Sequence, residues 1–495
     1  MDTTDLSHNL IDAQIPSTTN SDSALSLCPL VIVEGFFGTA GALLWGKFEE
    51  YMHLDERDEK SGSTARRQVV FASVGPVSSL HDRACELYYA IKGGVVDYGE
   101  AHSSANNHKR FGRDRGAGLY PQWSTTHPIH MLGHSIGGST IIKLQHMLAT
   151  GFFPDAHPDM ILSISSISSP FRGTQLSYIL GERLTSAPSV RPLSLGSLFT
   201  KVVHVLSYVS PFLPTWLDFH TESRSMSLYE TSVLELCGQL WKSDWAESRD
   251  ATPFDVTFGA AEEREGEGEG RVWGGTWYRS WAAVCTKKSD DGFAHAPILA
   301  TLLLPPMYIC SKLLASFDYT AVKPTPSFIF ANETTPRHTS PNEVIITDES
   351  TTTVPPSTIP PNIIPHNTTI PISRSQPEKE DPERAALIPR VLGEEYHAND
   401  GVVPLFSQWH PLACSATRCT HEETTLGEKS TADDRGGVPE PGRWHVVTLN
   451  DAHHLSLVPL WLKSRRQREF WVEVGGWLRS VEAAAAASER DNAGR

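Results

Sequence analysis

Residues Pro128–Thr140 read PIHMLGHSIGGST, and this stretch decides the fold. The apolar run Ile129–Leu132 leads straight into Gly-His-Ser-Ile-Gly, after which apolar residues recur at helical spacing until Gly151. A strand, a sharp turn and a helix, with small residues on both sides of Ser135, are typical of a nucleophile elbow, which lifts a serine hydroxyl above a parallel sheet. The alternative is an ordinary glycine-rich turn in which the serine caps the helix.

The overall charge and the cysteine content narrow the choice of partner and compartment. The chain has 495 residues and a formal charge of -16, from 58 acidic and 42 basic side chains. This balance disfavours nucleic acid or an anionic membrane surface as the main partner. The seven cysteines are odd in number and form no CxxC pair, so no disulfide framework is expected. The polar N-terminus lacks the basic and apolar segments of a secretory signal, which predicts a cytoplasmic or otherwise non-secreted protein.

A second glycine turn precedes the elbow in the chain. Residues 29–33 are all apolar, as in a buried parallel strand, and they end at a Glu-Gly-Phe turn. The backbone amides of Phe36 and of Ile136, the residue after Ser135, are predicted to form an oxyanion hole that holds the negative charge of an acyl intermediate. Without the elbow, an ordinary glycine turn explains the motif equally well.

The longest motif begins at Gly75 and reads GPVSSLHDRACELYYAIKGGVVDYGEAHSSANNHKRFGR. It resembles the lipase family that contains the staphylococcal and thermoalkalophilic bacillus lipases. The resemblance continues through HMLGHSIGG, ILSISSISSPFRGTQL, TWYRSWAAVC, NDGVV and HHLSL. It implies an α/β-hydrolase fold, in which helices flank a mostly parallel central sheet, with a small zinc-binding extra domain, a helical lid and long disordered insertions.

The same resemblance assigns the remaining members of a catalytic triad. Asp400 matches the triad acid, which orients the imidazole and stabilises its charged form. His454 follows the predicted last strand and matches the general base. His453 is the alternative, because adjacent side chains point in different directions and only one of them can reach Ser135. The chain order Ser, Asp, His is that of the α/β-hydrolases.

Two positions depart from the family pattern. Glu34 stands where the family usually has a histidine, and its negative charge lies close to the predicted oxyanion amide of Phe36. Ser456 stands where the bacterial lipases carry a calcium-binding glutamate, so no calcium site is expected. No organic cofactor is required for acyl transfer through a serine.

The resemblance also implies a zinc site in the extra domain. Its first three ligands match Asp82, His102 and His108, and Glu222 falls in the fourth ligand position. Oxygen and imidazole ligands suit Zn(II), and a site filled by four protein ligands is structural. From the residues alone, two histidines six positions apart more often belong to a solvated loop. The nearby side chains that can replace Glu222 are Asp218 and His220.

Residues 194–213 place apolar side chains at helical spacing, with few charges and Pro211 as a stop. Their position matches the lid helix of the family, which covers an acyl pocket when closed and meets lipid when open. A lid implies transient contact with a lipid surface. One more core helix is the alternative reading of the same pattern.

Composition and the family resemblance together divide the chain into five predicted segments. Residues 323–392 are rich in Pro, Thr, Ser and Asn, which predicts a low-complexity insertion, and nothing in it identifies a protein partner. A second polar stretch, 412–442, is predicted to lie on the surface. The predicted segments are a polar N-terminal tail (1–27), the first part of the hydrolase core with zinc subdomain and lid (28–322), the insertion (323–392), the last part of the core with Asp400 and His454 (393–482), and a C-terminal tail (483–495).

The function implied is a serine hydrolase of the lipase type, which cleaves triacylglycerols or related lipid esters through an acyl-enzyme. A catalytically weak hydrolase-fold protein that binds a lipid or a protein partner is the first alternative. A peptidase or acyltransferase that uses the same triad is the second.

Overall fold

The computed structural model describes residues 27–36, 45, 48–53, 66–214, 218–288, 295–298, 304–330, 391–425, 439–458 and 464–493. The predicted N-terminal tail, apart from its last residue, and most of the predicted 323–392 insertion lie outside the described residues. Within the described part of the chain, no helix is long and apolar enough to cross a membrane.

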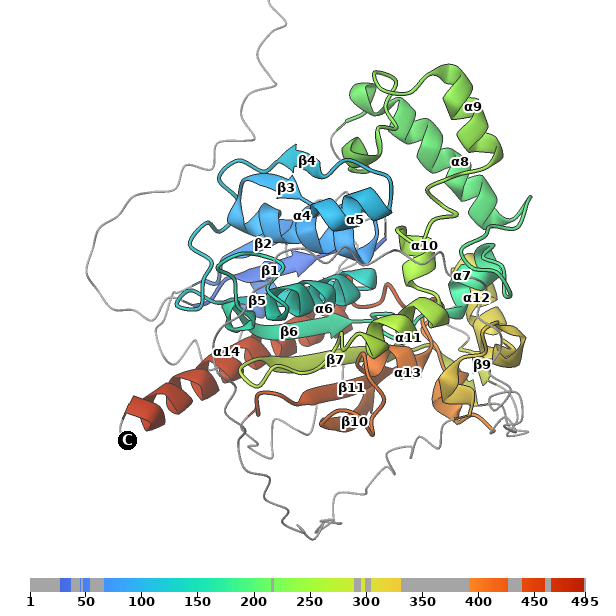
Figure 1. The fold of residues 1–495 in the computed structure, drawn as a ribbon. Coiled ribbons are helices and arrows are strands. Elements are labelled where there is room, and N and C mark those ends of the chain that lie inside the picture. Colours follow the sequence, from blue (N-terminus) through green and yellow to red (C-terminus); the bar gives the residue numbers. More distant parts are fainter. Residues whose placement is uncertain are drawn as a thin grey trace, which may run out of the picture.

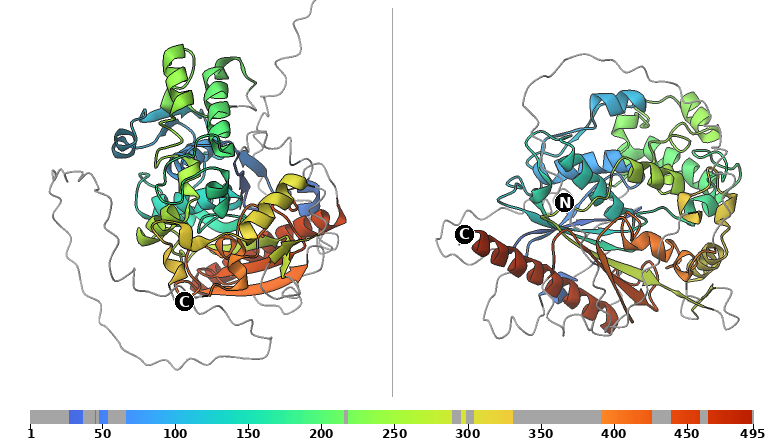
Figure 2. Two further views of the ribbon diagram at one scale, coloured as in Figure 1. Left: turned by 90° about the vertical axis from the view of Figure 1, so that its right-hand side faces the viewer. Right: turned by 60° about the horizontal axis from the view of Figure 1, so that its bottom comes forward.

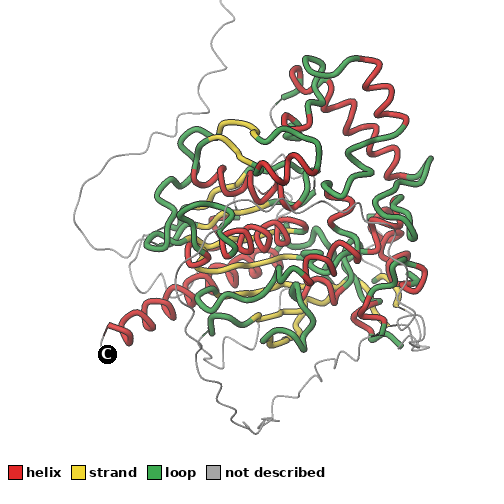
Figure 3. Tube along the Cα trace, in the orientation of Figure 1, coloured by secondary structure: helices red, strands yellow, loops and turns green. Residues whose placement is uncertain are grey.

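A seven-stranded sheet forms the centre of the molecule, with the strand order β10-β11-β7-β6-β5-β1-β2 (Figures 1 and 3). All neighbouring strands pair in parallel. Strand β10 lies at one edge and was not predicted, because the polar stretch around it was assigned to a surface insertion. The strands are β1 (Leu30–Val33), β2 (Val69–Ala72), β5 (Ile129–His134), β6 (Ile161–Ile167), β7 (Trp277–Val284), β10 (Cys419–Thr425) and β11 (Trp444–Asn450).

Helices cover both faces of this sheet (Figures 1 and 2). Helices α4 (Leu80–Lys92) and α6 (Ile136–Ala149) pack on one face, and α14 (Arg465–Ala493) and α2 (Glu49–Met52) on the other. Strand β1 is apolar at every position because its alternate side chains enter the two cores. This layered architecture is the predicted α/β-hydrolase fold.

Helix α14 runs along the sheet as a single long element that continues to Ala493, so the predicted C-terminal tail mostly forms its last turns. Its Glu482 carboxylate accepts hydrogen bonds from Arg67 Nη1 at 2.7 Å and Nη2 at 2.9 Å, and from the Cys28 backbone N–H at 2.8 Å. These contacts fasten the helix to the start of strand β1. Although burial opposes ionisation, the His130 and Arg67 side chains lower the pKa of Glu482 to about 2.

Helices α8 (Leu195–Tyr208) and α9 (Val233–Trp241) lie side by side and project from the body of the molecule (Figures 1 and 2). The helix predicted within residues 194–213 is therefore present, and the Ser194 hydroxyl caps it by accepting from Ser197 N. One face of α8 is buried through Val203 and His204, and its apolar opposite face is exposed.

The predicted extra domain lies beside α4. It contains the antiparallel strands β3 (Val95–Asp97) and β4 (Phe111–Asp114) and the short helix α5 (Glu100–Ala105).

At the other end of the core, Phe328 is buried against Tyr396 and Phe406, so the packed fold extends past the predicted start of the insertion. The other elements are α7 (Gln175–Leu180), α10 (Thr252–Asp255), α11 (Phe258–Gly266), β8 (Thr286–Lys288), β9 (His295–Pro297), α12 (Pro305–Ala315), α13 (Leu405–Trp409), and short 3-10 helices at Pro158–Met160, Ser210–Phe212, Glu222–Arg224, Tyr319–Ala321, Ser327–Ile329 and Glu394–Tyr396.

Candidate active site and metal groups

Ser135 occupies the turn between strand β5 and helix α6, as the sequence predicts. Its backbone has φ 55° and ψ -133°, a combination that non-glycine residues rarely adopt. Glycine is required on both sides of this turn. A Cβ at Gly137 would lie 2.0 Å from Val33 O, and one at Gly133 would lie 2.3 Å from Gly138 N. The Gly-x-Ser-x-Gly pattern thus permits the close packing that holds the serine.

Asp400 and His454 form a hydrogen-bonded acid and imidazole pair. His454 Nδ1 lies 2.8 Å from Asp400 Oδ2, and the other carboxylate oxygen accepts from the backbone N–H groups of Val402 and Val403 at 2.9 and 2.8 Å. Asp400 is fully buried. Because Nδ1 donates to the carboxylate, Nε2 of His454 is left free of its proton and can act as a base.

His453, the alternative base, makes different contacts. Its backbone N–H donates to Ser456 Oγ at 2.8 Å, and its ring Nδ1 accepts from Leu455 N at 3.2 Å. Of the two adjacent histidines, His454 is therefore the one whose ring is bonded to the buried acid.

His134, the residue before Ser135, links the elbow to this pair. Its Nε2 lies 3.0 Å from the His454 carbonyl oxygen, and the two rings are 4.9 Å apart. Burial lowers the pKa of His134 to about 3, so the ring is neutral and donates this bond. Between the described positions of Ser135 and His454 there is no side-chain hydrogen bond, and such catalytic contacts often tighten only when substrate is bound.

The turn after strand β1 lies directly against Ser135. A Cβ at Gly35 would lie 2.7 Å from Ser135 Cβ. The next residue, Phe36, has its ring 5.3 Å from Phe199 of helix α8. Ile136 is the first residue of α6. The two residues predicted to supply oxyanion amides thus come from the chain segments that adjoin Ser135.

A buried arginine, which the sequence analysis did not single out, braces this arrangement. Arg83 donates to Glu34 O at 2.6 Å, to Gly75 O at 2.7 Å and to Thr140 Oγ1 at 2.8 Å. Burial lowers its pKa to about 10, so it stays charged at neutral pH. It therefore connects the turn after strand β1 to helices α4 and α6.

The Glu34 side chain, which departs from the family pattern, is held by Trp45. The indole Nε1 donates to Glu34 Oε1 at 2.7 Å, and Glu34 is 9% exposed. This bond gives the carboxylate a defined position near the oxyanion turn.

The predicted metal ligands of the extra domain come together, with one replacement. Ligand atoms of Asp82, His102, His108 and Asp250 all lie within 4.8 Å of one another. His102 Nε2 is 3.2 Å from Asp82 Oδ1 and 3.2 Å from Asp250 Oδ1, and His108 Nε2 is 3.7 and 3.4 Å from the two carboxylates. In a tetrahedral zinc site with bonds of about 2.0–2.1 Å, such ligands are about 3.3 Å apart.

The chemistry of this group also fits a cation. His108 Nε2 is buried and has no hydrogen-bond partner in the described structure, although it faces both carboxylates. Burial raises the pKa of Asp82, whereas His102 and His108 hold that of Asp250 below its ordinary value despite its burial. Arg224 contacts both carboxylates. Two buried acids and two imidazoles that point inward form a suitable ligand set for Zn(II).

The prediction that Glu222 is the fourth member of this group is wrong. Asp250 lies beside Asp82, His102 and His108 instead. Glu222 lies at the surface and pairs with Arg113. The two substitutes are also engaged elsewhere. Asp218 pairs with Arg113 at 2.9 Å, and His220 Nδ1 lies 2.6 Å from Glu86 Oε2. Asp250 was missed because it belongs to a loop far along the chain, just before helix α10, with no motif around it.

A second possible metal group was also missed. It consists of His410, Cys414, Cys419 and His421. The sequence analysis considered the cysteines only for disulfides and CxxC pairs, and Cys414 and Cys419 form no CxxC pair. The occurrence of two cysteines and two histidines within residues 410–421 is the sequence signal that could have identified this group.

Comparisons with known proteins show that this chain is similar to bacterial lipases. Residues 27–195 match the family described as lipase-like, C-terminal domain. The lipase of Staphylococcus hyicus is 27% identical over 356 residues, which cover 67% of this chain and 51% of that protein. Lipase 1 of Staphylococcus aureus is 34% identical over 177 residues, 31% of this chain and 25% of that protein. The chain thus spans about half or less of the length of these relatives.

Solved structures confirm the fold. The crystal structure of Staphylococcus hyicus lipase matches with a TM-score of 0.61 and 20% identity, over 94% of this chain and 99% of that one. EstA from Clostridium botulinum matches with a TM-score of 0.55 and 21% identity, over 92% and 87% of the two chains. The resemblance to the staphylococcal-type lipases therefore holds in both sequence and architecture.

Proposed function

We propose that this chain, a relative of the staphylococcal-type lipases, is a serine hydrolase that cleaves carboxylic esters of lipids, triacylglycerols or related acyl esters. The observation that carries the proposal is the buried Asp400 and His454 pair beside the strained Ser135 turn. A serine forced into this conformation, next to a histidine whose tautomer is set by an acid, is suited to nucleophilic catalysis.

In the proposed mechanism, Ser135 Oγ attacks the ester carbonyl carbon while His454 Nε2 takes the hydroxyl proton. The backbone N–H groups of Phe36 and Ile136 donate to the resulting oxyanion. The tetrahedral intermediate collapses, the ester bond breaks, and His454 gives the proton to the leaving alcohol. Water, deprotonated by His454, then attacks the acyl-enzyme, which releases the acid and restores Ser135.

Lipid esters are favoured as substrates by the surface next to the oxyanion turn. Phe36 contacts Phe199 of helix α8, and that helix exposes Leu195 and Leu198, which are 68% and 60% exposed. Helix α9 adds Trp241, which is 93% exposed. Exposed apolar side chains of this kind are suited to contact with an acyl chain or a lipid surface. The helix α8 is proposed to act as the lid.

The extra domain is proposed to hold a structural Zn(II) through Asp82, His102, His108 and Asp250. The ion would cross-link α4, α5 and the loop before α10, with no part in the ester chemistry.

One observation favours a second candidate function, a catalytically weak protein that binds lipid through the same surface. Trp45 holds the Glu34 carboxylate next to the oxyanion turn, where a negative charge opposes the developing oxyanion.

Hydrolysis of nitrophenyl esters of increasing acyl length tests the proposal, with purified parent protein and Ser135→Ala assayed together. We expect rates in the parent that rise with acyl length and fall to background in the variant. Equal background rates in both proteins, with retained binding of lipid vesicles, would instead establish the binding function.

A further inference from the structure

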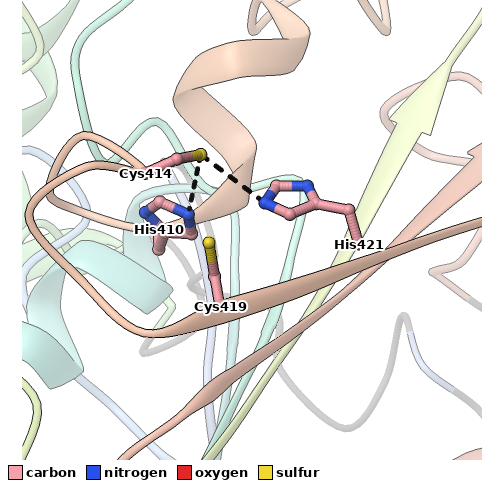
Figure 4. Close-up of side chains that lie close together, drawn as sticks. All are labelled: His410, Cys414, Cys419 and His421. Carbon is pink, nitrogen blue, oxygen red and sulfur yellow. Dashed lines mark hydrogen bonds between the residues drawn. The ribbon is translucent and has the colours of Figure 1, made fainter. Parts of the chain in front are cut away.

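A second cluster of metal-binding side chains lies at the opposite edge of the sheet from the extra domain. Ligand atoms of His410, Cys414, Cys419 and His421 all lie within 4.8 Å of one another. Figure 4 shows the four side chains turned toward a common centre. His410 follows helix α13, Cys414 lies in the loop after it, and Cys419 and His421 project from edge strand β10.

The distances in this cluster match those of a tetrahedral zinc site. Cys414 Sγ is 3.5 Å from His410 Nε2 and 3.6 Å from His421 Nε2. With Zn–S bonds of about 2.3 Å and Zn–N bonds of about 2.0–2.1 Å, a sulfur and a nitrogen ligand are about 3.6 Å apart. Neither Cys414 nor Cys419 is part of a disulfide.

The ring of His410 is already oriented as a ligand. Its Nδ1 lies 2.7 Å from the Leu412 carbonyl oxygen and donates to it, so Nε2 is unprotonated and faces Cys414. A backbone carbonyl on the far nitrogen is the usual way in which a metal-binding histidine is held in one tautomer. His410 is almost fully buried. Trp409 packs against His421, with ring centroids 4.8 Å apart.

A third group of possible metal ligands differs from the Cys414 cluster in its contacts. Cys28, His130 and Glu482 also come within ligand distance of one another. There, however, the group has only three residues, and Arg67 makes a two-bond ion pair with Glu482. In the Cys414 cluster, by contrast, the thiol lies within hydrogen-bond distance of both imidazoles.

We propose that His410, Cys414, Cys419 and His421 form a second structural Zn(II) site, separate from the one in the extra domain. Two thiolates and two imidazoles neutralise the ion and leave no position open for water or substrate. Binding releases the thiol protons, and no redox change is involved.

This site ties the edge strand to the segment that carries the triad acid. Helix α13 separates Asp400 from His410. Gln408 holds it to the core, because its Oε1 accepts from Ala283 N and its Nε2 donates to Ala283 O. Ser407 Oγ adds a bond by donating to Gly173 O at 2.7 Å. The metal would fix the far end of this helix onto β10, a strand with little apolar surface to hold it.

Metal analysis and cobalt substitution of the full-length protein test the site without any enzyme assay. The protein is purified under reducing conditions with added Zn(II), and bound zinc is counted. A second sample is prepared without metal and titrated with Co(II). Of the two proposed zinc sites, only this one contains sulfur ligands, so we expect a thiolate-to-cobalt charge-transfer band and the intense visible bands of tetrahedral cobalt in the parent protein.

Variants assign the band to these residues. Cys414→Ser and Cys419→Ser should each lose one zinc equivalent and the charge-transfer band. Cys237→Ser, which removes an exposed cysteine on α9, should keep both and serves as the matched control. Absence of the band in the folded parent, or a disulfide between Cys414 and Cys419 after purification under reducing conditions, would overturn the proposal.

Discussion

Ser135 is held in a conformation that costs about 1–3 kcal/mol for a residue with a side chain. Two backbone hydrogen bonds stabilise it, from Ser135 N to Ile167 O at 2.9 Å and from Gly138 N to Ser135 O at 3.1 Å. The packing of strand β6 against the turn therefore maintains the geometry of Ser135, the proposed nucleophile.

Asp400→Asn should reduce kcat for ester hydrolysis by about 10³- to 10⁴-fold, because an amide can stabilise neither the donating tautomer nor the charged form of His454. His453→Ala is the matched control, since its ring has no bond to the acid, and its kcat should stay within about threefold of the parent. Steady-state kinetics on a soluble ester distinguish the two. A larger loss of kcat in His453→Ala would show that His453, and not His454, is the base.

Glu34→Gln should raise kcat by about three- to tenfold, equivalent to about 1 kcal/mol in the barrier, because the amide oxygen still accepts from Trp45 while the charge near the oxyanion is removed. Trp45→Phe should lower kcat, since it removes the Nε1 donor to the carboxylate and leaves more negative charge near the oxyanion. Rates on one soluble ester measure both. Unchanged rates would show that this carboxylate does not influence the oxyanion.

At the scale of elements, helix α8 combines a buried face with an exposed apolar face. The double change Leu198→Ser and Val202→Ser should lower hydrolysis of emulsified long-chain esters by about tenfold, because it removes apolar contact with the lipid. Soluble short esters should be hydrolysed at the parent rate. Leu119→Ser, an exposed apolar residue outside α8, is the control. Equal losses on both substrates would argue against a role in lipid contact.

The ion pair that fastens α14 should make stability depend on pH. The pKa of Glu482 is about 2 in the folded protein, against an ordinary 4.5. Its contribution is therefore fully present above about pH 4.5 and is lost as the pH falls toward 2. Glu482→Gln should lower the free energy of unfolding at pH 7 by about 3 kcal/mol, since it leaves Arg67 buried without its partner.

Denaturant unfolding at pH 7 and pH 3 measures this effect. The difference between parent and variant should shrink at the lower pH. Glu489→Gln, an exposed position on the same helix, should show neither change. A difference that does not depend on pH would mean that packing, and not the charge of Glu482, holds the helix.

At the scale of the whole molecule, the Asp82 metal group joins segments that are distant in the chain. Removal of zinc by a chelator should lower the melting temperature by about 5–10 °C, because binding to the folded state alone contributes a few kcal/mol. Asp250→Asn should lose one zinc equivalent and show most of this decrease. Glu222→Gln should keep its metal and its melting temperature. If Glu222→Gln loses zinc instead, the original assignment of the fourth ligand is restored.

The sheet could be predicted only where its strands carry an apolar signal. Strands β1 and β5 are buried on both faces and read as short apolar runs, so their positions were confirmed within one or two residues. Strand β10 reads CTHEETT and has no such run. It forms because β11 offers it a complete ladder of backbone partners, which a polar sequence does not reveal.

The amino-acid sequence by itself determined the Ser135 turn, the buried strands and the apolar helix α8, because short-range sterics and the spacing of apolar side chains act within a few residues. It also pointed to Asp82, His102 and His108 through a resemblance. Only the tertiary structure decided that Asp250 completes that group, that His454 and not its neighbour bonds Asp400, and that four ligands meet at the edge of β10. Each of these depends on the distance between chain segments that are brought together when the sheet and its helices pack.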